Sequence, residues 1–218
     1  MFSNLAHLNR PATLLLSLLL LSSVVATTAA SERAGSALKA GVFDPARPAP
    51  EFSLHGSDGG EVALARYRGK VVLMAFGYTS CVAVCPITLA TLAEARKRLG
   101  PAAGAVQVIF VTVDPERENA AHMKDFLAEF DPSFVGATGT PDALAAVRQN
   151  YGVTAIKHGT GDDYVMDHSS SIYLIDRAGK LRGLMPYGHD ADDFVHDIKL
   201  LYGDGDAPPG ESIRGASR

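Results

Sequence analysis

The sequence predicts an α/β fold of three layers, in which helices cover both faces of a central mixed sheet. Two short, nearly continuous apolar runs, Val71 to Phe76 and Val106 to Val113, are typical of strands buried on both faces. An amphipathic segment, Pro86 to Leu99, lies between these runs. Near the C-terminus, Ser171 to Asp176 and Lys180 to Met185 flank a turn sequence and predict an antiparallel hairpin.

The first predicted unit is a strand, a helix and a second strand. The helix over Pro86 to Leu99 carries an apolar stripe opposite charged residues, and Gly100-Pro101 marks its end. A crossover between parallel strands is right-handed in nearly all proteins and places its helix on one face of the sheet. The two apolar strands are therefore expected side by side in mid-sheet.

The rest of the domain follows from three further helical segments. They are Asn119 to Phe130, Pro141 to Asn150 with proline in its first turn, and Ala191 to Tyr202. The tight turn Asp176 to Gly179 joins the two hairpin strands. These elements describe a layered fold of thioredoxin type, a single domain over residues 49–202.

The first thirty residues predict export. Arg10 is their only charged side chain, and an apolar stretch from Leu14 to Ala26 is followed by the small residues Ala29 and Ala30. This is the pattern of a signal peptide cleaved near Ala30. The alternative for residues 1–30 is an N-terminal membrane anchor, because the uncharged stretch from Pro11 is long enough to span a bilayer.

Residues 31–48 and 203–218 are predicted to be a flexible tether and a flexible tail, since both are rich in small, charged and proline residues without a hydrophobic period. The 218-residue chain has a net charge of −4, and removal of the arginine in residues 1–30 makes it −5. No basic run interleaved with aromatic residues occurs, so nucleic acid is excluded as a partner. The exported domain is expected in the periplasm, with anchoring at the outer face of the inner membrane as the alternative.

The only two cysteines, Cys81 and Cys85, lie where the first buried strand passes into the first helix. Pro86 suits a first helical position, which puts Cys85 at the helix N-terminus, where free amide groups and the helix dipole favour a thiolate. Ligands of open α/β sheets bind at the carboxyl ends of strands, where this loop falls. At least one sulfur is therefore expected to be reactive.

The C-x3-C spacing favours metal binding without excluding redox chemistry. A structural disulfide is the alternative, but a bridge over so short a loop constrains little of the unfolded chain. Two thiolates select copper(I), zinc or an iron–sulfur cluster, and the last two usually need four protein ligands. Copper fits a smaller ligand set.

A third ligand is sought among the seven histidines. His168 stands just ahead of a buried strand, beside Asp167 and Ser169 to Ser171, whose groups can fix its ring by hydrogen bonds. The other histidines outside the first thirty residues are expected to be solvated in loops or on polar helical faces: His55, His122, His158, His189 and His196. Met166 is expected in the core.

Three segments together carry a family resemblance: GYTSCVAVCP, the FVTVDPER of Phe110 to Arg117, and DHSSSIYLID. In order and spacing they resemble the SCO/SenC family of thioredoxin-like copper chaperones, over about Glu51 to Tyr202. The resemblance implies that Cys81, Cys85 and His168 bind one copper ion, as Cu(I) or Cu(II). Around these ligands, Asp114 and Asp167 are expected to form supporting hydrogen bonds.

The resemblance also implies that the protein loads the CuA centre of cytochrome c oxidase. The expected partners are oxidase subunit II or an intermediate copper carrier, and a thioredoxin-like reductant for a redox-active Cys81–Cys85 disulfide. One departure from the family is visible, because Val82 and Ala83 replace a proline and an acidic residue in the usual C-P-x-x-C-P loop. Loop rigidity and thiol reactivity are the properties this departure affects.

Two other functions remain open. A thiol-disulfide reductase would use Cys81 and Cys85 by exchange through a mixed disulfide, keeping a target's copper-binding cysteines reduced, and would not need His168. A redox or copper sensor would use the same pair to signal to a protein partner.

Overall fold

The computed structural model describes residues 37–161 and 163–203. The chain divides into two compact units, Met1–Ala37 and Leu38–Arg218, and the sheet and helices described below belong to the second. The predicted signal peptide or anchor, and the predicted tail beyond Gly203, lie outside the described residues. Within the described ranges, no helix combines the length and hydropathy that crossing a bilayer requires.

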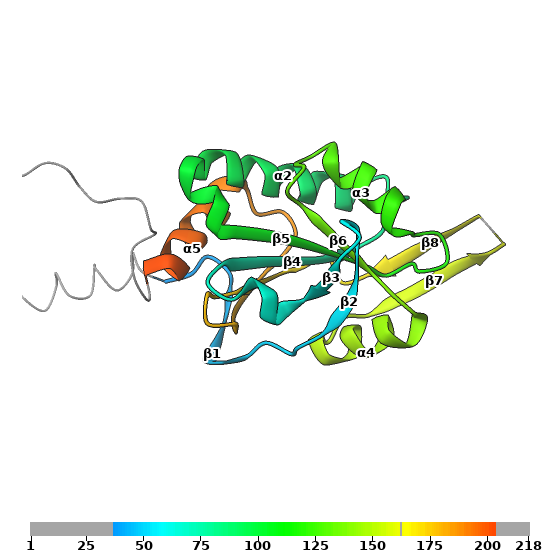
Figure 1. The fold of residues 1–218 in the computed structure, drawn as a ribbon, viewed down its shortest axis with the longest axis horizontal. Coiled ribbons are helices and arrows are strands. Elements are labelled where there is room, and N and C mark those ends of the chain that lie inside the picture. Colours follow the sequence, from blue (N-terminus) through cyan, green and yellow to red (C-terminus); the bar gives the residue numbers. More distant parts are fainter. Residues whose placement is uncertain (1–36, 162, 204–218) are drawn as a thin grey trace, which may run out of the picture. The chain divides into compact units, whose positions relative to one another are not determined.

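The core of the domain is one mixed sheet of eight strands, in the order β1-β10-β9-β4-β5-β6-β2-β3 (Figure 1). The strands are β1 Gly41–Pro48, β2 Ser53–Gly56, β3 Glu61–Ala63, β4 Val71–Gly77, β5 Val106–Thr112, β6 Val135–Thr138, β9 Ile172–Ile175 and β10 Lys180–Met185. A separate two-stranded sheet contains β7 Ala155–Thr160 and β8 Asp163–His168.

The predicted pairing of the central strands is confirmed. β4 and β5 are parallel neighbours, and every residue of both strands is buried. β9 and β10 form the antiparallel hairpin, and β9 also pairs antiparallel with β4. The sheet is mixed because β4 pairs parallel with β5 on one side and antiparallel with β9 on the other.

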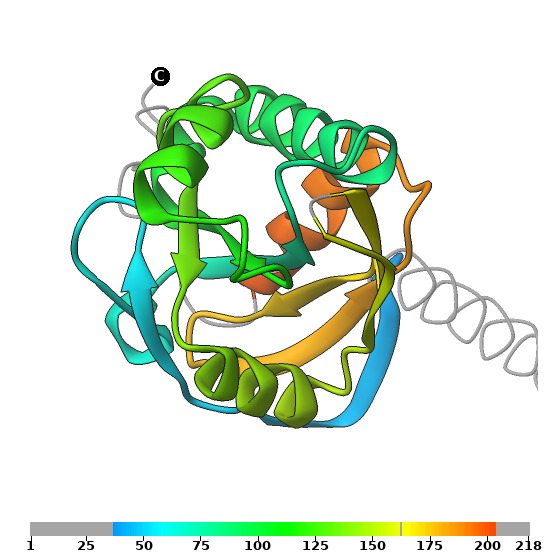
Figure 2. The same cartoon turned by 90° about the vertical axis from the view of Figure 1, so that its right-hand side faces the viewer.

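Within residues 37–203, apart from the undescribed residue 162, four α-helices cover the sheet: α2 Val84–Leu99, α3 Ala120–Ala128, α4 Pro141–Tyr151 and α5 Ala191–Gly203. Apolar side chains of α2, α3 and α5 share one buried cluster, which includes Leu89, Met123 and Ile198. Those of α4, including Leu144 and Val147, belong to a second cluster. Figure 2 shows α4 on the sheet face opposite α2 and α3, as the predicted three layers require. The described residues also form two short 3-10 helices, η1 Leu64–Tyr67 and η2 Gly100–Ala105.

The prediction of a flexible tether over residues 31–48 is wrong for Gly41–Pro48, because these residues form the edge strand β1. It pairs antiparallel with β10, from Gly41 opposite Leu184 to Pro48 opposite Lys180. Most of its side chains are exposed, so it lacks the apolar alternation that identifies a half-buried strand. Backbone pairing with β10 attaches this strand to the sheet, and such pairing cannot be predicted from hydrophobic periodicity.

Candidate metal centre

The two cysteines lie in the loop that leaves the carboxyl end of β4 and in the first turn of α2. Both are free thiols; Cys81 is partly exposed and Cys85 is buried. The Cys85 side chain packs so closely on the end of β4 that a Cβ at Gly77 would lie 2.8 Å from Cys85 Sγ and 2.6 Å from the Phe110 ring. Glycine at this position therefore makes room for the buried sulfur.

The expectation that Cys85 is the sulfur favoured as a thiolate is wrong. Helix α2 begins at Val84, and Cys85 points into the core, so burial raises the pKa of its thiol to about 12. Partial burial also raises the pKa of Cys81, but hydrogen bonds from the backbone N–H groups of Cys85, Ala83 and Val84 outweigh this and lower it overall. Cys81 thus takes the free amides of the helix start, where the N-cap Ala83 supplies no side-chain acceptor.

His168 ends β8 and reaches the buried cysteine. Its Nε2 lies 3.7 Å from Cys85 Sγ. Its Nδ1–H donates to the carbonyl of Ser169 at 2.9 Å, and this bond orients the ring with Nε2 on the side of the sulfur. A cavity of about 10 Å³ touches both side chains and is also lined by Thr88 and Phe110. The structure therefore presents the Cys85 sulfur and the His168 Nε2 to one small space.

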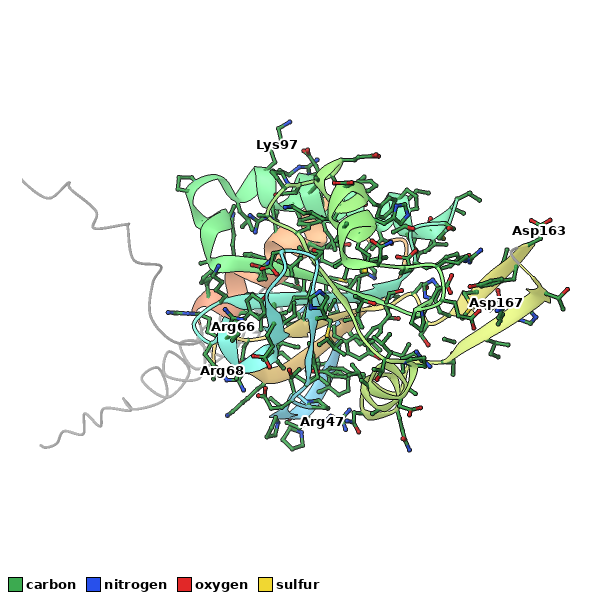
Figure 3. All side chains as sticks on the ribbon, turned by 45° about the vertical axis from the view of Figure 1, so that its right-hand side comes forward. Arg47, Arg66, Arg68, Lys97, Asp163 and Asp167 are labelled. Atoms are coloured by element: carbon green, nitrogen blue, oxygen red, sulfur yellow. The ribbon has the colours of Figure 1, made fainter. Side chains whose placement is uncertain are left out.

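Neither of the two carboxylates that were expected to support His168, Asp167 and Asp114, forms a hydrogen bond with its ring in the described residues. Adjacent residues of a strand point to opposite faces, and Asp167 Oδ2 lies 2.9 Å from His158 Nε2 on the outer face of the projecting hairpin (Figure 3). The Ser169 carbonyl holds the imidazole instead. Asp114 is buried and accepts hydrogen bonds from Tyr164 Oη at 2.5 Å and Arg117 Nε at 2.6 Å. It therefore supports residues near His168 rather than His168 itself.

Comparison with known proteins places the chain in a family. A family model described as SCO1/SenC matches residues 43–203. The chain belongs to the SCO1/SenC family. Among its relatives are the mouse protein SCO2 homolog, mitochondrial, with 35% identity over 153 residues, and the Arabidopsis thaliana SCO1 homolog 1, mitochondrial, with 32% over 149 residues. These matches cover 68% and 67% of this chain but only 60% and 45% of the relatives, so the chain spans about half the length of each.

Solved structures of SCO proteins have the same fold. The Bradyrhizobium japonicum ScoI structure with copper bound is 36% identical, with a TM-score of 0.67 over 71% of this chain and 99% of the other. The Thermus thermophilus apo Sco1 structure is 34% identical, with a TM-score of 0.70 over 76% and 98%. The thioredoxin-like fold predicted from the sequence is confirmed by these likenesses.

The loop of this SCO1/SenC domain is held by residues that the sequence analysis did not single out. Glu118 is buried, and its Oε1 accepts hydrogen bonds from the Thr79 backbone N–H at 3.0 Å and from Thr79 Oγ1 at 2.6 Å. Burial raises the pKa of Glu118, and its charge contributes to the raised pKa of Cys85. In the sequence, Glu118 is marked only by its place in the cluster of charged residues that directly follows the second buried strand. Its contact with Thr79 spans about forty residues of chain, so no local pattern predicts it.

The site brings together two of the three predicted ligands and places the third in the same loop. In the described part of the chain, no three Cys, His, Asp or Glu side chains are already gathered as a metal site. Cys85 and His168 are in contact, while Cys81 Sγ faces the start of α2. Metal–sulfur and metal–nitrogen bonds of about 2.3 and 2.0 Å, the values for zinc, let one ion contact both atoms across their separation. This donor set fits a soft ion of low coordination number.

Proposed function

We propose that this SCO1/SenC protein binds one copper ion through Cys81, Cys85 and His168 and delivers it to the CuA centre of cytochrome c oxidase. The observation that carries the proposal is the 3.7 Å contact between Cys85 Sγ and the Nε2 atom of the His168 imidazole. Structures of relatives support it, because those from Bradyrhizobium japonicum, Arabidopsis thaliana and yeast are described with copper bound. Another relative, BsSco, is described as a member of the Sco family of cytochrome c oxidase assembly proteins.

The ligand set suits both oxidation states of the cargo. Two thiolates balance the charge of Cu(II), and two sulfurs with one nitrogen satisfy Cu(I), which accepts low coordination numbers. The buried Cys85 forms the inner side of the site, while Cys81 and His168 are both partly exposed, so an incoming thiolate reaches the ion from the side of Cys81 and His168. Release to a recipient is easier from such a site than from a closed cage of four ligands.

The proposal extends to partners and location. The recipient is subunit II of the oxidase or an intermediate copper carrier, and a thioredoxin-like protein reduces the Cys81–Cys85 disulfide before loading, because a disulfide cannot ligate copper. The protein acts in the periplasm after export, either free or tethered to the outer face of the inner membrane by residues 1–30. The mitochondrial names of several relatives are consistent with a role beside a respiratory membrane.

The substitution His168→Ala tests delivery. Loss of one of three ligands should weaken copper binding by at least roughly tenfold and impair oxidase assembly in copper-starved cells. Thiol exchange should survive, since both sulfurs and the helix start remain. The control is His158→Ala, which removes an exposed histidine of the same hairpin and should change neither property. Normal oxidase assembly by His168→Ala at low copper would contradict copper delivery.

One observation favours a second function, thiol-disulfide reduction. The pKa of Cys81 is lowered and that of Cys85 is raised to about 12, so the pair consists of one accessible nucleophile and one buried, protonated thiol. A dithiol reductase attacks with the first and resolves the mixed disulfide with the second. Such an enzyme would reduce the copper-binding cysteines of the oxidase, and His168→Ala would leave it active.

A further inference from the structure

The ligands of the proposed copper site belong to two sheets that share no backbone pairing. Cys81 and Cys85 follow β4 of the central sheet, whereas His168 ends β8. In the described part of the chain, β8 pairs only with β7, and this hairpin projects from the end of the domain (Figure 1). Besides the short connection of residues 169–171 to β9, the separation of sulfur and imidazole therefore depends on the side chains that fasten the hairpin to the central sheet.

Arg117, in the loop between β5 and α3, is one such fastening. Its Nη1 donates to the backbone carbonyl of Tyr164 on β8 at 3.1 Å, and its guanidinium carbon lies 3.6 Å from the centre of the Tyr164 ring. Its Nε donates to Asp114 Oδ2 at 2.6 Å, while Asp114 Oδ1 accepts from Tyr164 Oη at 2.5 Å. These three residues thus form a closed set of contacts that joins β8 to the end of β5.

The same guanidinium is linked to the imidazole through Tyr78. Its carbon lies 5.7 Å from the centre of the Tyr78 ring. The Tyr78 ring packs edge-on against the His168 ring, with centres 5.9 Å apart and planes at 83°. The Tyr78 hydroxyl also accepts from the backbone N–H of Met166, two residues before His168, at 3.4 Å. Arg117 therefore contacts both the strand that carries His168 and the ring that packs on it.

The hydrogen bonds of Arg117 use two of its three guanidinium nitrogens. Its Nη2 is buried and has no hydrogen-bond partner among the described residues. A buried donor without a partner is costly, and such groups often mark a geometry retained for function. The planar fork of arginine can donate to Asp114 and Tyr164 while its face lies on a ring, which lysine cannot reproduce.

We infer that Arg117 is a positioning residue that holds the His168 imidazole beside Cys85 through Tyr164 and Tyr78. The inference rests on the proposed copper site. Arg117→Met keeps the aliphatic stem and removes the donors, so the hairpin should loosen and the copper affinity should fall roughly tenfold, the scale of losses beyond the direct ligands. Because Arg117 acts through His168, the same change in a His168→Ala background should have little further effect.

The experiment is a double-mutant cycle on the purified, reduced full chain. Copper(I) affinity is measured by competition with a chromophoric chelator for the unsubstituted protein, Arg117→Met, His168→Ala and the double variant. Arg66→Met, an exposed arginine at the end of the domain away from the hairpin, is the matched control and should bind copper normally (Figure 3). Arg117→Lys keeps the charge but not the fork and should recover only part of the affinity.

Hydrogen exchange of the Met166 amide in copper-free protein provides a second measurement. It should accelerate in Arg117→Met and stay unchanged in Arg66→Met. Absence of copper binding by the unsubstituted protein would contradict the proposed function, whereas normal affinity and normal Met166 exchange in Arg117→Met would overturn this inference. An equal loss of affinity with and without His168 would also overturn it. If Arg117→Met does not fold, Arg117→Lys, which keeps the charge but loses the contacts of the fork, takes its place, and unchanged affinity and Met166 exchange in that variant overturn the inference.

Discussion

The two thiols of the site differ because burial and helix amides act on different sulfurs. Cys85 lies in the core against Gly77 and Phe110, and burial raises the pKa of its thiol to about 12. Cys81 accepts hydrogen bonds at the start of α2, which lower the pKa of its thiol below the ordinary value of 9.0 despite partial burial. Near neutral pH, Cys81 is the sulfur with the larger thiolate fraction.

Alkylation rates should show this difference. A lowered pKa keeps thiolate present below pH 9 until the pH falls through the lowered value, whereas Cys85 stays protonated until the pH approaches about 12. At pH 7, iodoacetamide should therefore modify Cys81 much faster than Cys85 in the reduced protein, as peptide mass spectrometry can measure. The rate profile of Cys81 should have its midpoint below pH 9. Faster modification of Cys85 would contradict this account of the thiols.

The four adjacent strands β10, β9, β4 and β5 could be predicted from the sequence, whereas the short interior strands β2 and β6 and the edge strands β1 and β3 could not. β4 and β5 are continuous apolar runs because both of their faces are buried. β1 and β7 are mostly exposed and carry charged or small residues, so their pairing leaves no periodic signal. The position of β8 was likewise missed, and with it the reason why His168 reaches Cys85.

Edge strand β1 depends on one buried carboxylate of α5. Asp197 is fully buried and accepts from the backbone N–H groups of Lys39 at 2.7 Å and Ala40 at 2.9 Å, just before the strand begins. Asp197→Ala would leave these donors without an acceptor, so the free energy of unfolding should fall by about 2 kcal/mol or more. Amide exchange in β1 should also accelerate.

Urea denaturation of Asp197→Ala measures this effect. The matched control is Asp192→Ala, which removes a mostly exposed carboxylate near the start of the same helix and should cost less than about 1 kcal/mol. Equal stability of the two variants would mean that Asp197 does not fasten β1. Copper binding should be the same in both, because neither carboxylate contacts the cysteines or His168 in the described structure.

At the scale of the whole domain, the sequence indicated the candidate ligands better than their surroundings. Cys81 and Cys85 follow from soft-ligand chemistry at the carboxyl end of a strand, and His168 follows mainly from the family resemblance. The contacts of Glu118 with Thr79 and of Arg117 with Tyr164 join segments about forty residues or more apart. Local patterns carry no information on such contacts, so only the folded domain shows how the loop and the hairpin are held together.

The most direct test of the account is copper titration of the reduced and the disulfide-oxidised protein. The reduced protein should bind about one copper ion, with a sulfur-to-copper charge-transfer band when Cu(II) is added, because both thiolates are available as ligands. The oxidised protein should bind almost none, since the disulfide removes both sulfurs and leaves His168 alone. If the oxidised protein binds copper as tightly as the reduced protein, the cysteines are not the copper ligands.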